Sequence, residues 1–322
     1  EITREEQRIA LPQLQEPIKA LYIDVQGNWL FVLNGRAHMD VFDLRRRTLN
    51  GRYEMTADAS TEVTASAQLL GGISLLIGDS KGGIAQWFMA RDPDDEQRLK
   101  FIRGFQLGDA AITQIAAEER RKGFVALNAA GELGVFHSTA HRTLLTENVS
   151  DSGTAMFALS PRANRILLED GQRLLPFSLE NEHPEISWSS LWSKVWYESY
   201  SEPKHIWQST AATVDFEPKM SLAPLTFGTL KAAFYAMLLA APLAIAAAIY
   251  TAYFMAPGMR RKVKPVIELM EALPTVILGF FAGLFLAPYV EAHLPGIFSL
   301  LLLTPLGILL AGFLWTRLPE SL

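Results

Sequence analysis

The chain contains no cysteine. This absence excludes disulfide bonds, thiol catalysis and cysteine metal sites, and it fits any cellular compartment. The sequence also lacks the Gly-x-x-x-x-Gly-Lys-Ser/Thr loop that holds nucleotide phosphates and the Gly-x-Ser-x-Gly turn that presents a nucleophilic serine. We therefore expect no catalytic residue, no cofactor and no ATP binding by this chain.

Metal sites also find little support in the sequence. His137 and His141 have the spacing of metal ligands on a helix, but they fall at the end of an expected strand and in a loop. The acidic run at Asp92, Asp94 and Asp95 lacks the glycine and the closing glutamate of a calcium loop. We expect no bound metal.

Charge is missing from three long stretches in the last third of the chain. They comprise 28 residues between Lys231 and Arg260, 19 residues over 272–290, and 25 residues over 292–316. A helix of 28 residues reaches about 40 Å, whereas the bilayer core is about 30 Å thick. The pattern predicts membrane spans at about 230–256, 272–290 and 295–316, which is more than a simple anchor needs.

The remaining two thirds of the chain are acidic. The net charge is −8 before Pro218 and +3 from Pro218 onward. Such an acidic region argues against nucleic acid as a partner and against broad docking on anionic lipid.

Basic residues indicate how the spans are oriented. Arg260, Arg261, Lys262 and Lys264 follow the first span and Arg317 follows the third, whereas the turn between the second and third carries only Glu291 and His293. Cytoplasmic loops are the ones enriched in lysine and arginine. The bias predicts that the loop at 257–271 is cytoplasmic and that residues 1–224 lie outside the inner membrane, in the periplasm of a bacterium.

Four segments of the acidic region share one pattern: an apolar strand, a turn, and a second strand that ends in an aromatic residue. Their starts are separated by 43, 51 and 42 residues, a spacing typical of propeller blades. Glycines at the turns suit tight hairpins. We expect an all-β, propeller-like domain over 1–186, of the WD or quinoprotein-like repeat type with about four blades, followed by an α-helical membrane domain; a β-sandwich is the alternative. The four segments are 30–42, 73–88, 124–136 and 166–177.

Both ends of the chain look like cuts, since there is no initiator methionine and the sequence stops just after a span. We expect an internal fragment of a longer protein, with further blades before it.

An aromatic linker over 187–224 joins the two regions. Trp188, Trp192, Trp196 and Tyr200 recur every fourth residue, so that a helix would place them in one row. Tryptophan and tyrosine favour the membrane–water boundary. The row predicts an interfacial helix with these four anchors; the alternative is that the rings pack under the propeller or against the spans.

The predicted spans carry features beyond those of a lipid anchor. The first has an alanine-rich surface that lets another helix approach closely, and prolines lie in or beside all three spans. Glu268 and Glu271 stand at the cytoplasmic mouth of the second span, three residues apart on one helical face. They are candidates for a coupling site; the alternative is that they are solvated.

Residues 227–280 resemble the start of the membrane domain in the phosphate-specific (PstC-like) permease subunits of binding-protein-dependent ABC importers. The resemblance rests on Gly228-Thr229-Leu230, on a basic loop, and on the motif that enters the second span, whose matching positions are Glu268, Leu269, Ala272, Leu273, Pro274, Thr275, Val276 and Gly279. It adds Pro274 and Gly279 to the coupling candidates. The Glu-Ala-Ala coupling loop of that family is absent from this chain and would lie beyond Leu322.

The resemblance implies a non-enzymatic subunit for phosphate transport across the bacterial inner membrane, residing in membrane lipid. Its implied partners are a second permease subunit, a cytoplasmic ATPase dimer and a periplasmic phosphate-binding protein, with no nucleic acid. Sulfate or molybdate stays open as the solute. Two other hypotheses are a membrane-tethered quinoprotein-type dehydrogenase, which would need a tryptophan repeated in each blade, and a propeller sensor or assembly scaffold.

Overall fold

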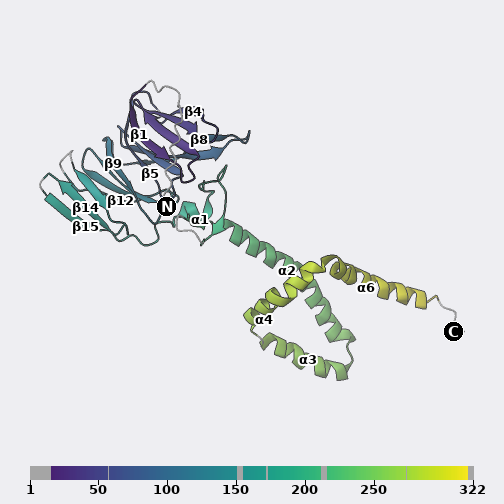
Figure 1. Cartoon of the computed structure of the whole chain (residues 1–322). Coiled ribbons are helices and arrows are strands. Elements are labelled where there is room, and N and C mark those ends of the chain that lie inside the picture. Colours follow the sequence, from purple (N-terminus) through teal and green to yellow (C-terminus); the bar gives the residue numbers. More distant parts are fainter. Residues whose placement is uncertain are drawn as a thin grey trace, which may run out of the picture. The chain divides into compact units, whose positions relative to one another are not determined.

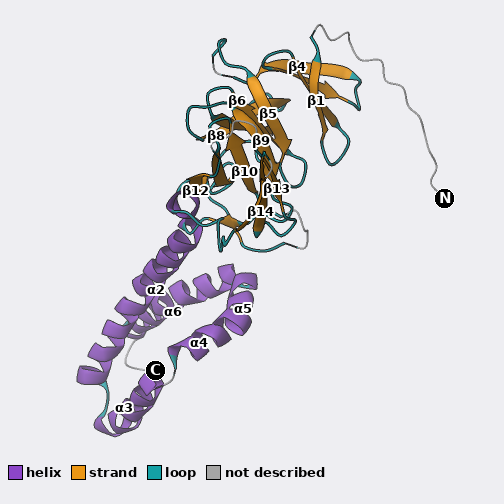
Figure 2. Ribbon diagram, turned by 90° about the vertical axis from the view of Figure 1, so that its left-hand side faces the viewer, coloured by secondary structure: helices purple, strands orange, loops and turns teal. Residues whose placement is uncertain are grey.

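Short antiparallel strands make up most of the first part of the chain, and long helices make up the rest (Figure 2). The computed structural model describes residues 16–56, 58–150, 155–171, 173–211, 216–272 and 274–317. The chain divides between Ala233 and Phe234 into two compact units, which we call the strand unit and the helix unit. This division falls inside the first long helix, which begins at Ala223.

The strand unit contains three four-stranded sheets and one three-stranded sheet in chain order (Figure 1). Within each sheet every strand pairs antiparallel with the next one along the chain, as in a propeller blade. Sheet 1 consists of β1 (Ile18–Ile23), β2 (Trp29–Asn34), β3 (His38–Asp43) and β4 (Thr48–Glu54). Sheet 2 consists of β5 (Val63–Gln68), β6 (Ser74–Asp79), β7 (Gly83–Arg91) and β8 (Gln97–Gln106). Sheet 3 consists of β9 (Ile112–Ala117), β10 (Gly123–Asn128), β11 (Glu132–His137) and β12 (Arg142–Asn148). Sheet 4 consists of β13 (Met156–Leu159), β14 (Arg165–Asp170) and β15 (Arg173–Ser178).

The four repeated segments of the sequence are confirmed as hairpins. They correspond to the pairs β2–β3, β6–β7, β10–β11 and β14–β15. The polar insert at 92–96, which lengthens the second interval, forms the turn between the long strands β7 and β8. The strand unit is therefore a row of propeller-type blades, as the repeat spacing predicted.

Two glycines are required by the packing of neighbouring turns. Gly82 has φ of +79°, and a Cβ there would lie 2.5 Å from the carbonyl oxygen of Gly108. Gly131 has φ of +80°, and its Cβ would lie 1.7 Å from the carbonyl oxygen of Ser150. A side chain at either position would meet both an unfavourable backbone conformation and fixed backbone atoms.

The core of the strand unit consists of three clusters, one between each pair of successive sheets. Strand β10 shows how they are built, because neighbouring side chains in a strand point to opposite faces. Phe124 and Ala126 pack toward sheet 2, whereas Val125 and Leu127 pack toward sheet 4. A middle sheet is thus buried on both faces, which is why its strands read as continuous apolar runs.

The linker after sheet 4 differs from the prediction. Helix α1 (Trp188–Trp192) begins with a capping box between Ser187 and Ser190 and ends after five residues. Val195 then exchanges backbone hydrogen bonds with Lys204, and β16 (Trp207–Gln208) pairs with β17 (Lys219–Met220). The expected single helix through Trp188 and Tyr200 is therefore wrong, because the backbone at Val195 pairs across a loop instead of along a helix.

Three helical stretches are long and apolar enough to cross a membrane: Ala223–Phe254, which begins in the strand unit and continues into the helix unit, and Thr275–Ala292 and Leu294–Trp315 of the helix unit. The first starts seven residues earlier than the sequence indicated. The segment 257–271, expected as a loop, is helical. In chain order the elements are α2 (Ala223–Ile249), η1 (Tyr250–Phe254), α3 (Pro257–Ala272), α4 (Thr275–Phe281), η2 (Ala282–Leu286), α5 (Ala287–Ala292) and α6 (Leu294–Trp315).

Candidate functional site

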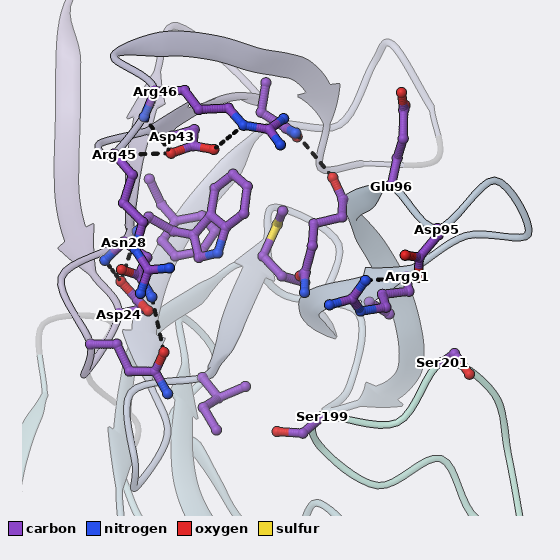
Figure 3. Close-up of a pocket in the computed structure, with 18 of the residues that line it drawn as sticks. Asp24, Asn28, Asp43, Arg45, Arg46, Arg91, Asp95, Glu96, Ser199 and Ser201 are labelled. Carbon is purple, nitrogen blue, oxygen red and sulfur yellow. Dashed lines mark hydrogen bonds and ion pairs between the residues drawn. The ribbon is translucent and has the colours of Figure 1, made fainter.

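A groove of about 1140 Å³ opens between sheets 1 and 2 of the strand unit. Its walls come from the β1–β2 turn, the β3–β4 turn and the β7–β8 hairpin, and the linker contributes Ser199 and Ser201 (Figure 3). Apolar side chains, among them Trp29, Phe31 and Met89, also line it. The groove is thus formed by segments far apart in the sequence and includes the chain that leads to the first candidate span.

Charged side chains in the groove are arranged in pairs and in turns. Asp24 accepts backbone hydrogen bonds from Asn28 (2.6 Å) and Trp29 (2.7 Å), which holds the β1–β2 turn. The guanidinium of Arg91 lies 2.7 Å from the carboxylate of Asp95 (Figure 3).

The groove suits binding better than catalysis. Among the described residues that line it, none is a histidine or cysteine that could activate Ser199 or Ser201. Within the described parts of the chain, no cluster of three histidine, aspartate or glutamate side chains is arranged to hold a metal ion. With both charge signs and an apolar wall, the groove suits a polar ligand or a protein loop.

Beside the groove, a buried charged network joins the linker to sheets 2 and 3. Its centre is Glu198, which accepts hydrogen bonds from Lys122 Nζ (2.5 Å) and Ser74 Oγ (2.6 Å). Glu217 accepts the backbone N–H of Glu198 (3.0 Å) and the hydroxyl of Thr139. We call this group, with Gln86, Arg103 and Ser138, the junction network.

Arg103 extends the junction network along the linker. Its guanidinium donates to the carbonyl oxygens of Ser138 (2.6 Å), in the turn between β11 and β12, and of Trp196, in the linker. Ser138 in turn donates to Gln86 (2.7 Å). Moving the linker would leave these buried charges without partners, which is costly. The contacts therefore hold the linker in one position on the sheets.

Burial displaces the pKa values of the network. Desolvation, with the nearby carboxylate of Glu217, raises the pKa of Glu198, although Lys122 opposes the shift. Desolvation lowers the pKa of Arg103. Burial raises the pKa of Tyr197 to about 12, with a further contribution from Glu217. Within the network Lys122 forms an ion pair with Glu198, whereas Arg103 donates to backbone carbonyl oxygens.

His137 and His141 do not share a site. His137 is buried at the end of β11, where its Nδ1 accepts the backbone N–H of Ala140 (3.2 Å). Burial, followed by the charge of Arg121, lowers the pKa of His137 to about 3. The ring of His141 contacts the carbonyl oxygen of Gly104 (2.9 Å) and packs edge-on against Phe105.

The aromatic residues of the linker divide into two kinds. Trp188 and Trp192 lie on α1 and are 80% and 44% exposed. Trp196 packs edge-on against Phe88 of sheet 2, and its indole N–H donates to the carbonyl oxygen of Tyr200 (2.9 Å). The four rings therefore do not form one row. The alternative of packing against the propeller describes Trp196, while a membrane contact of Trp188 and Trp192 stays a prediction.

The coupling candidates lie at the start of the second candidate span. Glu268 is an exposed residue of α3, 3.9 Å from Lys264 Nζ. Glu271 belongs to the same helix, but its side chain lies outside the described residues. Pro274 is the N-cap of α4, and Gly279 lies within α4 with open space around it. No described hydrogen bond or ion pair joins these residues, and their role stays a prediction.

The sequence analysis missed the groove and the junction network. One signal for the network was present, since Arg103 lies two residues before the buried Phe105 in β8 and therefore on the same face of the strand. A charge at a core-facing position of a strand marks a buried partner elsewhere. Glu198, 76 residues further along from Lys122, carries no such local signal.

Comparison with known proteins finds similarity to a transporter over part of the chain. No family model matches the sequence. A stretch of 77 residues is 39% identical to a probable ABC transporter permease protein, YqgH, of Bacillus subtilis (strain 168). The match covers 24% of this chain and 25% of the relative, so the chain spans about a quarter of the length of that protein.

Solved structures with similar strands align at low identity. The WD40 repeats of RRP9 align with 13% identity and a TM-score of 0.38, over 52% of this chain and 53% of that one. Sqt1 of Chaetomium thermophilum aligns with 14% identity and a TM-score of 0.42, over 51% and 43%. The assignment of propeller-type blades rests on the strand order and packing described above.

Proposed function

We propose that this chain is part of the permease subunit of an ABC importer. The observation that carries the proposal is the 77-residue similarity to a probable ABC transporter permease, in a chain with three candidate membrane spans. Permeases are not enzymes themselves; they form the path for the solute, while separate subunits hydrolyse ATP. The absence of a nucleotide-binding loop from the sequence agrees with this division of labour.

The proposed location is the bacterial inner membrane. Under the positive-inside rule, the cations of α3 and Arg317 support a cytoplasmic location for these segments, which implies a periplasmic location for the strand unit. In this arrangement the groove lies in the same compartment as the arriving solute, and it is available to bind a polar ligand or a loop of a delivery protein.

Phosphate is the proposed solute, on the resemblance of residues 227–280 to phosphate-specific permeases. The proposed partners are a second permease subunit, a cytoplasmic ATPase dimer and a periplasmic phosphate-binding protein. Prolines 242 and 305 lie inside α2 and α6, where each removes one backbone hydrogen bond. Such positions let a span bend, and the alanine-rich part of α2 lets a partner helix approach.

The test is uptake of radiolabelled phosphate by cells that lack the gene for this chain. We expect uptake to fall, to return with the intact gene, and to require the partner ATPase. Labelled sulfate and molybdate, tested in the same cells, decide the solute. Phosphate uptake that persists without the ATPase would reject the ABC assignment. If deletion of the gene abolishes uptake of sulfate instead of phosphate, sulfate is the solute.

The orientation has its own test with reporter fusions. A reporter that works only in the cytoplasm should be active after Lys262 and inactive near Asp94. A periplasmic reporter should give the opposite pattern. Activity of the same reporter at both positions would contradict the arrangement with the strand unit outside.

A further inference from the structure

Helix α3 (Pro257–Ala272), which joins the first two candidate spans, has an apolar and a charged face. Met259, Val263, Val266 and Met270 recur at intervals of three or four residues and therefore share one face. Met259, Val266 and Met270 are 57%, 55% and 62% exposed. Leaving such a face in water forfeits the gain from burying apolar surface, so the face needs a partner.

The charges of α3 are not placed to stabilise the helix itself. Its four cations lie in the first half, at 260, 261, 262 and 264, and its carboxylates, Glu268 and Glu271, lie near the C-terminus. The helix dipole favours the reverse order, with acids first and cations last. The first turn of α3 contains no acidic residue and the last turn no basic residue. This order of charges gives the helix itself little stabilisation and leaves cations available to a negatively charged partner outside it.

The chain keeps both ends of α3 close to the candidate spans. Residues 255–256 separate α3 from the end of the first span, and residues 273–274 separate it from the start of the second. A residue extends at most about 3.6 Å, so each end of α3 lies within about 11 Å of a span end. Consecutive spans exit and enter on the same bilayer surface. A helix of 16 residues, about 24 Å long, must then run along that surface.

Arg260 fixes the start of α3 to the first span. Its guanidinium donates to the carbonyl oxygens of Ala252 (2.5 Å) and Met255 (3.4 Å), at the end of η1. Cations at the C-terminus of a helix satisfy carbonyl groups that lack partners within it. Arg260 is thus occupied, and the cations that can meet a surface are Arg261, Lys262 and Lys264, the last of which forms only an exposed pair with Glu268 at 3.9 Å.

We propose that α3 lies in the headgroup region of an anionic bilayer. The apolar face contacts the upper acyl chains, and Arg261, Lys262 and Lys264 contact lipid phosphates. The acidity of the strand unit does not oppose this, because the contact is confined to one helix. The inference rests on the membrane insertion in the proposed function, and it does not depend on transport or on the solute.

The absence of cysteine makes a direct test possible, because single cysteines can be introduced and spin-labelled in the full chain. The labelled sites are Val266→Cys and Met270→Cys on the apolar face, and Arg261→Cys and Glu268→Cys on the charged face. Leu302→Cys in α6 and Glu147→Cys in β12 serve as lipid and water references. The chain is reconstituted in vesicles of phosphatidylcholine with and without phosphatidylglycerol. Collision rates with oxygen and with a water-soluble nickel chelate are measured.

We expect the oxygen-to-nickel ratio to be several-fold higher at Val266 and Met270 than at Arg261 and Glu268. Equal ratios on both faces, with Leu302 in lipid, would overturn the inference alone. Low rates with both reagents at Val266 and Met270 would show a protein partner on the apolar face and would also overturn it. A Leu302 label that reads as water would instead contradict membrane insertion, and with it the proposed function.

A charge variant tests the lipid headgroups. We expect R261Q/K262Q/K264Q to lower the ratio at Val266 in vesicles with phosphatidylglycerol to the value found in phosphatidylcholine alone. The matched control, R47Q/R120Q/K194Q, removes three exposed cations from the strand unit and should leave the ratio unchanged. A ratio at Val266 that is the same in both lipids would overturn the role of anionic headgroups.

Discussion

Large apolar side chains lie in the interior of the strand unit but on the surface of the helix unit. In the strand unit the large apolar residues, such as Phe124 and Phe136, are fully buried. In the described spans of the helix unit no apolar residue is buried; Leu302 and Phe280, for example, are 65% and 68% exposed. Water drives apolar groups inward, whereas hydrocarbon accepts them, and a helix satisfies its own backbone in either solvent. The contrast agrees with a strand unit suited to water and helices suited to lipid.

The two units also differ in how they hold charged side chains. The strand unit buries Lys122, Glu198 and Arg103 and pairs each of them with a neighbour. In the helix unit the described charges lie at the ends of spans and on α3, where they are largely exposed. Burial makes a charge dependent on its partner, while exposure makes it nearly independent. Substitutions of comparable residues should therefore change the free energy of unfolding more in the strand unit than in the helix unit.

The largest expected difference concerns apolar residues. Phe124→Ala should lower the free energy of unfolding of the strand unit by about 3–5 kcal/mol, because it opens a cavity between sheets 2 and 3. Leu302→Ala in α6 should change stability by about 0.5 kcal/mol or less, because the structure shows no packing to lose. Urea unfolding in detergent, followed by tryptophan fluorescence, measures both. Equal losses would show that α6 packs against protein and would remove the contrast.

The junction network gives the next effect. Lys122→Met should destabilise the strand unit by about 3–5 kcal/mol, since it leaves Glu198 buried without its cation. The double variant K122M/E198Q should recover part of the loss, because the uncompensated charge is then gone. Lys264→Met, in the exposed pair with Glu268, should change stability by about 0.5 kcal/mol or less. Additive losses in the double variant would contradict the pairing of Lys122 with Glu198.

Acid should affect the strand unit through His137. Burial lowers the pKa of His137 to about 3, so the folded state keeps this ring neutral at pH values where the unfolded chain, with a pKa near 6.5, binds a proton. The resulting stability is full above pH 6.5 and is lost as the pH falls. At pH 5 the loss is about 2 kcal/mol.

The measurement is urea unfolding from pH 7.5 to pH 5, compared between the wild type and two variants. His137→Asn should lower by about one the number of protons that the chain takes up on unfolding near pH 5. His183→Asn, at an exposed position, should leave the dependence unchanged. An unchanged slope in H137N would exclude His137 as its source. Helical circular dichroism of the helix unit should persist in detergent over the same range.

The sequence predicted those parts of the fold that form between residues close together in the chain. Apolar runs around glycine turns predicted the hairpins, because each hairpin forms between residues close in the sequence. The uncharged stretches of the sequence agree within a few residues with the helices that are candidate spans, except at the start of the first. The spacing of Trp188, Trp192, Trp196 and Tyr200 misled us, because an equal spacing does not show that the backbone remains helical.

Other features depend on contacts that no local pattern reports. The junction network joins Ser74, Lys122 and Glu198, which only the packing of the linker on two sheets brings together. Helix α3 was expected as a loop because its four cations were interpreted only as a topology signal. Its apolar spacing, Met259 to Val263 to Val266 to Met270, was present in the sequence and would have predicted a helix.

The smallest expected effect on stability belongs to the coupling candidates. Glu268→Lys with Glu271→Lys should change the free energy of unfolding by about 0.5 kcal/mol or less, because Glu268 is exposed on α3. If the two carboxylates couple the permease to its ATPase, the complex should still be isolated intact, but substrate-stimulated ATPase activity should fall. The substitutions also add positive charge to α3, which the anionic bilayer surface would hold more strongly.

The double variant E268Q/E271Q separates these two causes. It removes the carboxylates without adding cations, so a loss of stimulation in both variants assigns the effect to the carboxylates themselves. A loss in the lysine variant alone assigns it to altered seating of α3 on the lipid. Wild-type stimulation in both variants, with normal uptake, would show that Glu268 and Glu271 are solvated charges. The contrast between the units would then extend to function, with buried charges indispensable and exposed ones replaceable.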